Sequence, residues 1–346
     1  MGKHWNKMVG GALAFVFLGS AVAQTSAPDR LWKLRNRYDF LERSLRLLTT
    51  AYTDLFRNLD EMEGRLVDIA TISEGRLTTE PGVPLSTSDR SNQTTIYFTP
   101  YMGNNIALFN GTNWVVTAFT ELSLVLSGLT SGQNHDIFIY NNAGTVTIDT
   151  PTAWTDSVTR ATALVAQDGV WVKSGATTRR YVGTIRATST TQTQDTLAQR
   201  FVWNYQNRLT KKLQVLEATN SWTYVTNGWR SANTSVNNRV EFVLGQSDVL
   251  VEARVFNQIQ AGAGTVNYYA NGVGLDTTTN VSSQVRGSGA AVNIINQVWS
   301  DYKDYPGLGY HFLQWVERSN GSSVTVYGDN GDATSYQGGL LGEFSG

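Results

Sequence analysis

The chain has 346 residues, enough for two or three domains, with a formal net charge of −1 and 16% charged residues. This nearly neutral balance excludes the strongly basic surface with which proteins bind nucleic acid or an anionic membrane. The chain has no cysteine, which excludes a disulfide framework, an iron–sulfur cluster, a cysteine-ligated zinc site and a cysteine nucleophile.

The first 24 residues can be interpreted in two ways. Lys3 and Lys7 precede an apolar run over residues 8–23, and the end of this run matches the small-residue pattern of a cleavage site. As a helix the run would be about 24 Å long, shorter than the roughly 30 Å hydrocarbon core of a membrane. Residues 1–24 are therefore either a secretory signal peptide or an uncleaved apolar anchor.

Residues 25–72 contain an unbroken heptad repeat. Apolar residues alternate at spacings of three and four through Leu31, Leu34, Tyr38, Leu41, Leu45, Leu48, Tyr52, Leu55, Leu59, Met62, Leu66 and Ile69. Helices that wind around one another need this strict period, whereas a single helix drifts away from it. The core is rich in leucine, and no buried Asn or Lys enforces a dimer. The pattern predicts a three-stranded parallel coiled-coil stalk with these residues in its core; the alternative is one amphipathic helix packed on its own domain.

After the helix, apolar residues alternate with a period of two. Gly75 is expected to end the helix as a C-terminal glycine. Strands are predicted at 95–99, 106–109, 114–116, 136–140, 145–148, 169–173 and 181–185. The segment 110–113 between two of them, Asn-Gly-Thr-Asn, is a strong hairpin signal. Short strands separated by Gly/Asn turns predict a first β-sandwich domain over residues 75–194.

Residues 195–212 break this alternation. Their apolar residues, Leu197, Phe201, Val202, Tyr205 and Leu209, have helix-like spacing, so we predict a linker with a short helix. A second β domain is predicted over residues 213–346. Its expected strands are 240–244, 249–256, 310–317, 323–327 and 338–344. The last of these strands lies almost at the end of the sequence, as in trimeric jelly-roll heads.

Several short motifs support a family resemblance. They are TTIYFTPY at 94–101, NIALFNG at 105–111, TRATAL at 159–164, VKSG at 172–175, TTRRYVGTI at 177–185 and AQRFVWN at 198–204. With them, residues 75–212 resemble a β domain that recurs in bacteriophage tail and head-fibre proteins. Residues 213–346 are similar in layout to the tumour-necrosis-factor/C1q-like jelly roll. The resemblance implies a mainly β homotrimeric fibre on a virion surface, with an N-terminal coiled coil and two β-sandwich or jelly-roll domains in series.

The expected function is structural and adhesive. The partners would be two further copies of the chain, virion structural proteins or a membrane at the N-terminus, and a host surface glycan or protein at the C-terminal head, but no nucleic acid. Trp222, Tyr224 and Trp229 are candidate receptor contacts because aromatic rings stack on sugars. One alternative is a secreted bacterial surface adhesin or filament subunit, exported by a signal peptide. Another is a glycan-degrading enzyme of the tailspike kind.

The sequence offers no catalytic constellation, so we expect no enzyme, no cofactor and no metal site. Asp301, Asp304 and Glu317 lie near aromatic residues, but the sequence cannot place them at the 5–10 Å separation that glycan hydrolysis needs. The remaining polar candidates have simpler interpretations. Residues 329–332 are interpreted as an Asn-Gly turn rather than a Ca²⁺ loop, His135 and His311 as structural, and Arg179-Arg180 as solubilising residues at a strand edge.

Overall fold

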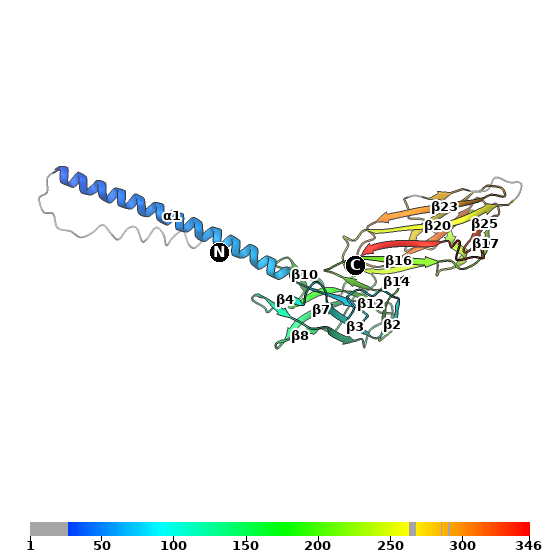
Figure 1. Ribbon diagram of the computed structural model, residues 1–346, viewed down its shortest axis with the longest axis horizontal. Coiled ribbons are helices and arrows are strands. Elements are labelled where there is room, and N and C mark those ends of the chain that lie inside the picture. Colours follow the sequence, from blue (N-terminus) through cyan, green and yellow to red (C-terminus); the bar gives the residue numbers. More distant parts are fainter. Residues whose placement is uncertain (1–26, 263–267, 285, 290) are drawn as a thin grey trace. The chain divides into compact units, whose positions relative to one another are not determined.

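The computed structural model describes residues 27–262, 268–284, 286–289 and 291–346. The described chain is mainly β with one long N-terminal helix, as predicted (Figure 1). It divides into two compact units, residues 1–64 and residues 65–346. We call the second of these, which contains all the described strands, the β unit. Residues 1–24, interpreted above as a signal peptide or anchor, lie outside the described residues. Within the described ranges, no helix combines the length and the apolar character needed to cross a membrane.

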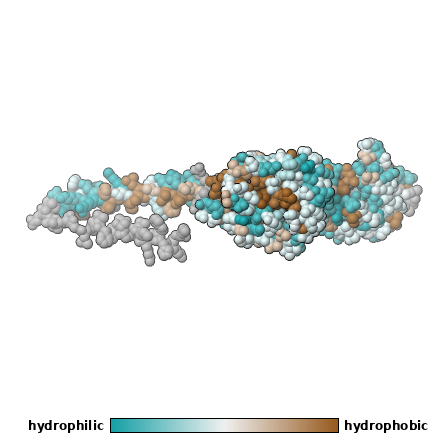
Figure 2. Space-filling model, turned by 90° about the horizontal axis from the view of Figure 1, so that it is seen from below, coloured by the Kyte–Doolittle hydropathy of each residue, from teal (hydrophilic) through white to brown (hydrophobic). Residues whose placement is uncertain are grey.

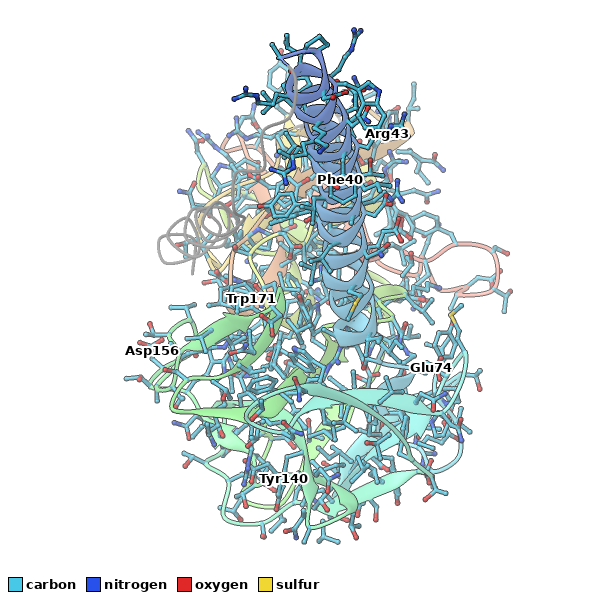
Figure 3. The ribbon with its side chains drawn as sticks, turned by 90° about the vertical axis from the view of Figure 1, so that its left-hand side faces the viewer. Phe40, Arg43, Glu74, Tyr140, Asp156 and Trp171 are labelled. Carbon is cyan, nitrogen blue, oxygen red and sulfur yellow. The ribbon has the colours of Figure 1, made fainter. Side chains whose placement is uncertain are left out.

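Helix α1 runs from Ala27 to Thr71, close to the predicted span of 25–72. Its first turn contains Asp29, whose charge is favourable at the positive end of the helix dipole. Surface ion pairs one turn apart, Arg46 with Glu42 and Arg57 with Asp54, add a few tenths of a kcal/mol each. Side chains project from α1 on all sides, as Phe40 and Arg43 illustrate (Figure 3).

The prediction that Gly75 caps the helix as a C-terminal glycine is wrong. The helix ends at Thr71, and Gly75 begins strand β1, paired with Pro100. A Cβ atom at Gly75 would lie 2.2 Å from the ring of Phe98, so glycine is required there by close packing. The turn between helix and strand is held instead by Glu74, whose carboxylate accepts hydrogen bonds from the backbone N–H and the side-chain amide of Asn105.

Strands from the first half of the β unit form three sheets. The three-stranded sheet has the order β1-β3-β6 and the two-stranded sheet is β4-β5. The seven-stranded sheet has the order β10-β11-β12-β7-β8, with β15 on β12 and β9 on β7. The bounds are β1 Gly75–Thr78, β3 Thr95–Pro100, β4 Asn105–Phe109, β5 Trp114–Ala118, β6 Leu122–Val125, β7 Asn134–Asn142, β8 Thr145–Ile148, β9 Thr152–Ala153, β10 Leu164–Gln167, β11 Val170–Lys173, β12 Ala176–Arg186 and β15 Val202–Asn204.

Two further sheets complete the unit. The six-stranded sheet has the order β16-β26-β20-β25-β17, with β23 on β20; the eight-stranded sheet has the order β2-β13-β14-β19-β24-β21-β22, with β18 on β24. The bounds are β2 Arg90–Gln93, β13 Thr193–Asp195, β14 Gln199–Arg200, β16 Thr210–Leu216, β17 Ser221–Tyr224, β18 Arg230–Ser231, β19 Arg239–Leu244, β20 Val251–Ala261, β21 Tyr269–Leu275, β22 Gly287–Ser288, β23 Ile295–Asp304, β24 Gly309–Ser319, β25 Val324–Tyr327 and β26 Gly339–Ser345, with the 3₁₀ helix η2 at Ala232–Thr234.

The prediction of a short helix within residues 195–212 is wrong. The segment contains strands β14 and β15 and the start of β16, and β14 pairs in parallel with β19. Phe201, Val202 and Trp203 are all buried, whereas a half-buried strand would bury only alternate residues. A strand that is buried on both faces loses its period of two, and its apolar run can then be mistaken for a helix. Through β13 and β14, strands from both predicted β domains share one sheet.

The six-stranded and eight-stranded sheets share one hydrophobic core. Phe242 on β19 and Trp315 on β24 belong to the same buried cluster as Val255 on β20 and Leu340 on β26. These two sheets therefore pack face to face. A second core lies among the sheets of the first half. The two halves are also bridged by Arg160, which binds the carboxylate of Asp136 at 2.6 Å and the backbone carbonyl of Gly245 at 2.7 Å.

Candidate functional site

The predicted coiled-coil core forms an exposed apolar stripe on the single chain, which we call the seam. Its described positions from Leu31 to Met62 are 43–68% exposed. Ile69, near the helix end, is half-buried, and the side chain of Leu66 lies outside the described residues. Hydrophobic surface is visible along α1 in Figure 2. Large apolar side chains are normally buried in a soluble protein, so this continuous exposed row is a candidate surface for binding a partner.

Three further apolar side chains are exposed on α1 outside the seam. Trp32, Phe40 and Leu47 are 64–72% exposed and fall outside the heptad core positions. At 3.6 residues per turn, they lie roughly a third of a turn away from the middle of the seam. Their spacing does not follow the heptad period, so the heptad pattern in the sequence does not include them.

The end of α1 is fixed to the β unit by Arg180. This side chain is 1% exposed, and its Nη1 donates to the carbonyl oxygens of Ala70 and Ala107, both at 2.7 Å. Its Nη2 donates to the carbonyl oxygen of Thr71 and to the side-chain oxygen of Gln206. The last carbonyls of a helix have no partner within the helix, and here a buried guanidinium supplies one. Burial lowers the pKa of Arg180 to about 10.

The interpretation of Arg179-Arg180 as a solubilising pair is therefore wrong for Arg180. Arg179 does face outward: its guanidinium lies 3.8 Å from the ring centroid of Tyr140 and 3.6 Å from the carboxylate of Asp149. Adjacent residues of a strand point to opposite faces, so one arginine reaches solvent while its neighbour enters the core.

A buried carboxylate organises the region that contains the candidate receptor contacts. Glu317 on β24 is 0% exposed, and its oxygens accept hydrogen bonds from Trp222 Nε1 at 2.9 and 3.1 Å. Arg230 forms an ion pair with it at 2.8 Å, and Tyr269 Oη donates to it at 3.2 Å. Burial raises the pKa of Glu317, although the hydrogen bond from Trp222 and the charge of Arg230 act in the opposite direction.

The three candidate aromatic residues have different surroundings. Trp222 is half-buried and is bound to Glu317. Tyr224 is 5% exposed, and its hydroxyl donates to the carbonyl oxygen of Gly228 at 2.6 Å. Trp229 lines a hollow of about 490 Å³ together with Tyr268 and Arg318. Of the three, Trp229 is therefore the residue placed to contact a bound molecule.

The three carboxylates considered for glycan hydrolysis have separate surroundings. Asp301 on β23 pairs with Arg254 at 2.5 Å, and Asp304 accepts a hydrogen bond from the backbone N–H of Tyr305. Glu317 belongs to β24 in the other sheet and is buried there. The structure therefore does not place Asp301 or Asp304 beside Glu317 in a common site.

The 329–332 segment forms the turn that the sequence predicts. Asn330 and Gly331 have φ angles of 52° and 74°, the left-handed values that an Asn-Gly turn needs. The carboxylate of Asp332 is occupied by its own loop, accepting hydrogen bonds from Thr334 and Ser335. Among the described residues, no group of three or more His, Asp or Glu side chains is arranged to hold a metal ion.

The two described histidines are engaged in local contacts. His135 is buried, and its Nδ1 lies 3.2 Å from the carbonyl oxygen of Gln133; burial lowers its pKa. His311 lies 2.8 Å from the carboxylate of Asp276.

Comparisons with known proteins identify no family for this chain. No protein-family model matches the chain, and no curated protein matches it. Among solved structures, it is similar to a Bacillus thuringiensis Cry1Da tryptic core variant, with 7% identity and a TM-score of 0.20 over 81% of this chain. The chain spans about half of that protein, 53% of its length. At this TM-score the likeness carries no argument about fold or function.

Proposed function

We propose that this chain is the subunit of a homotrimeric bacteriophage fibre. In this proposal α1 forms a three-stranded coiled-coil stalk, and the C-terminal strands form a head that meets the host surface. The observation that supports the proposal best is the seam, whose apolar side chains are exposed in a single chain although the β unit buries its own apolar residues in shared cores.

The energetics of the seam favour association. Burying a large apolar side chain contributes about 1.5–3 kcal/mol, so the ten seam residues from Leu31 to Met62 would contribute about 15–30 kcal/mol per chain. This is a gross term, from which the cost of ordering the helices and their side chains is subtracted. It supports association through the seam.

The side chains of the seam favour three helices over two. Leucine predominates, β-branched residues are absent from the a positions, and Tyr38 and Tyr52 are too bulky for a narrow two-stranded core. All seam positions follow one heptad register, as a continuous coiled coil requires, and the proposed helices are parallel.

The order of the C-terminal strands supports a jelly-roll head. One sheet contains the neighbours β16-β26-β20-β23 and the other contains β19-β24-β21-β22. Counting these eight strands alone, without β17, β18 and β25, this is the first, eighth, third and sixth strand opposite the second, seventh, fourth and fifth, the arrangement of a jelly roll. Such heads close around a threefold axis in many fibres, and three identical heads convert weak contacts into useful avidity.

The virion assignment rests on the resemblance of residues 75–212 to phage-fibre domains and is tested directly on particles. Mass spectrometry of purified virions should detect this chain in multiples of three per fibre, and the purified chain should compete with virions for adsorption to host cells. Its absence from particles would overturn the assignment.

A secreted bacterial adhesin is the second candidate, favoured by the signal-like residues 1–24. N-terminal sequencing of native material separates the two functions. A start at Gln24 supports export, whereas an intact Met1 or Gly2 supports an anchored fibre.

A further inference from the structure

The hollow beside Trp229 is built at one end of the eight-stranded sheet. Arg318 on β24, Ala270 on β21 and Ser288 on β22 are register partners, so their side chains share one face of the sheet. The small side chain of Ala270 lies between the other two and leaves space above the sheet. The neighbouring strands β17 and β25 are labelled at the right of Figure 1.

The hollow is positively charged. Arg286 and Arg318 line it, and none of the described lining residues is acidic. The nearest carboxylate in the strand, Glu317, is 0% exposed and is paired with Arg230. Alternate residues of a strand point to opposite faces, so the charge of Glu317 is directed away from the hollow.

One of the two guanidinium groups is held in place. Nε and Nη2 of Arg318 both donate to the side-chain oxygen of Asn227, at 3.0 and 2.7 Å. A guanidinium fixed in this way loses little entropy when it binds an anion, and its planar fork matches carboxylate and phosphate groups.

Aromatic rings provide the remaining contact surface. Trp229 is half-buried, and Tyr268, the residue before β21, is 58% exposed. In the sequence, Trp229 is next to Arg230 and Tyr268 is next to Tyr269, and both of these neighbours bind Glu317. Aromatic side chains beside a few polar groups are typical of sites that bind small polar ligands.

We propose that this hollow binds an anionic saccharide, with the sugar ring against Trp229 and Tyr268 and its acidic group on Arg286 and Arg318. The inference rests on the proposed attachment function and names the class of receptor for its head. Carboxylated and phosphorylated sugars share this chemistry, and the two sources are separated by experiment.

The test is ligand-observed NMR on the full chain with D-glucuronic acid, glucose 6-phosphate and glucose. We expect transfer of magnetisation from the protein to one or both acidic sugars, and none to glucose. Arg318→Met should weaken binding about tenfold or more, because one charge-assisted hydrogen bond amounts to that factor. Trp229→Ala should also weaken binding, because it removes the aromatic surface against which the sugar ring packs. Arg286→Met, which changes an exposed side chain, repeats the test without disturbing the fold.

Matched controls are Trp299→Ala and Arg254→Met, which remove an exposed tryptophan and an exposed arginine elsewhere in the same unit. Both should bind like the wild type. Equal binding of glucose, or unchanged binding in all three hollow variants, would overturn the inference. If neither acidic sugar binds while the chain is trimeric and present in virions, the inference fails and the proposed function stands.

Discussion

Arg180 Nη1 lies 2.7 Å from the carbonyl oxygen of Ala70, 110 residues earlier in the chain, and donates a hydrogen bond to it. A strand in the middle of the β unit thus completes the last turn of α1. Ala70 and Arg180 belong to the same compact unit, residues 65–346, so the contact joins the last turn of the helix to the strands of that unit.

Arg180→Met should weaken this joint. The substitution leaves the carbonyl oxygens of Ala70, Ala107 and Thr71 without their donor in a buried place. We expect a loss of about 2–5 kcal/mol in the free energy of unfolding, measured by chemical denaturation. Amide hydrogen exchange in the last turn of α1 should accelerate at the same time.

The matched control for this variant is Arg179→Met. Arg179 is largely outside the core, so its loss should cost only about 1 kcal/mol and leave exchange in the helix unchanged. Equal effects of the two substitutions would contradict the role given to Arg180.

Charges on the seam should dissociate the oligomer. Leu45→Asp combined with Leu48→Asp places two carboxylates per chain in the predicted core, where unpaired charge is strongly unfavourable. Sedimentation should then show monomers. Leu47→Asp is the control, because Leu47 is 72% exposed but lies off the seam, and it should leave the oligomer intact. Dissociation by Leu47→Asp alone would place the interface elsewhere.

Removing the charge of Glu317 should destabilise the β unit. Glu317→Gln leaves Arg230 without its partner and places an amide among hydrogen-bond donors, so we expect a loss of about 2–4 kcal/mol at neutral pH. Glu252→Gln removes an exposed partner of Lys303 and should cost less than about 1 kcal/mol. Thermal and chemical unfolding of the two variants compare these costs.

The difference in stability between the wild type and Glu317→Gln should depend on pH in a defined direction. Burial raises the pKa of Glu317 in the folded state, so the folded chain binds more protons than the unfolded chain just above the usual glutamate pKa of about 4.3. The stability of the wild type relative to Glu317→Gln should therefore fall as the pH rises through this window. A relative stability that rises there would show that the pairing with Arg230 outweighs burial.

Gly245 lies where the two halves of the β unit meet. A Cβ atom there would lie 2.1 Å from Tyr181 Oη and 2.4 Å from the ring of Trp203. Gly245→Ala should therefore cost about 1–3 kcal/mol through overpacking, measured by denaturation. Gly228→Ala, whose Cβ meets nothing within 4 Å, should be nearly neutral.

The alternation of apolar and polar residues predicted many of the strands, and the heptad repeat predicted the long helix. Every strand expected from a period of two is present within a few residues, and β26 forms at the last predicted strand. Strand β21 was missed because it contains two glycines and no alternating pattern. Strand β23 was not predicted, because polar residues such as Asp301 and Lys303 give its sequence the composition of a loop.

The candidate site was predictable only in part. Trp229 was selected from the sequence as an aromatic residue, and the structure adds Arg318 from a strand some ninety positions later. No local pattern links such distant residues, because only strand register brings them together. The burial of Glu317 and Arg180 was also not predictable from the sequence. A charged residue in a strand is expected to be exposed to solvent unless its buried partners are known.

In the proposed function, α1 assembles three chains through its seam. Sedimentation equilibrium of the purified full-length chain tests it most directly. We predict a single species with three times the mass of one chain, stable over a wide concentration range. A monomer at micromolar concentrations, with the seam still exposed, would contradict the account.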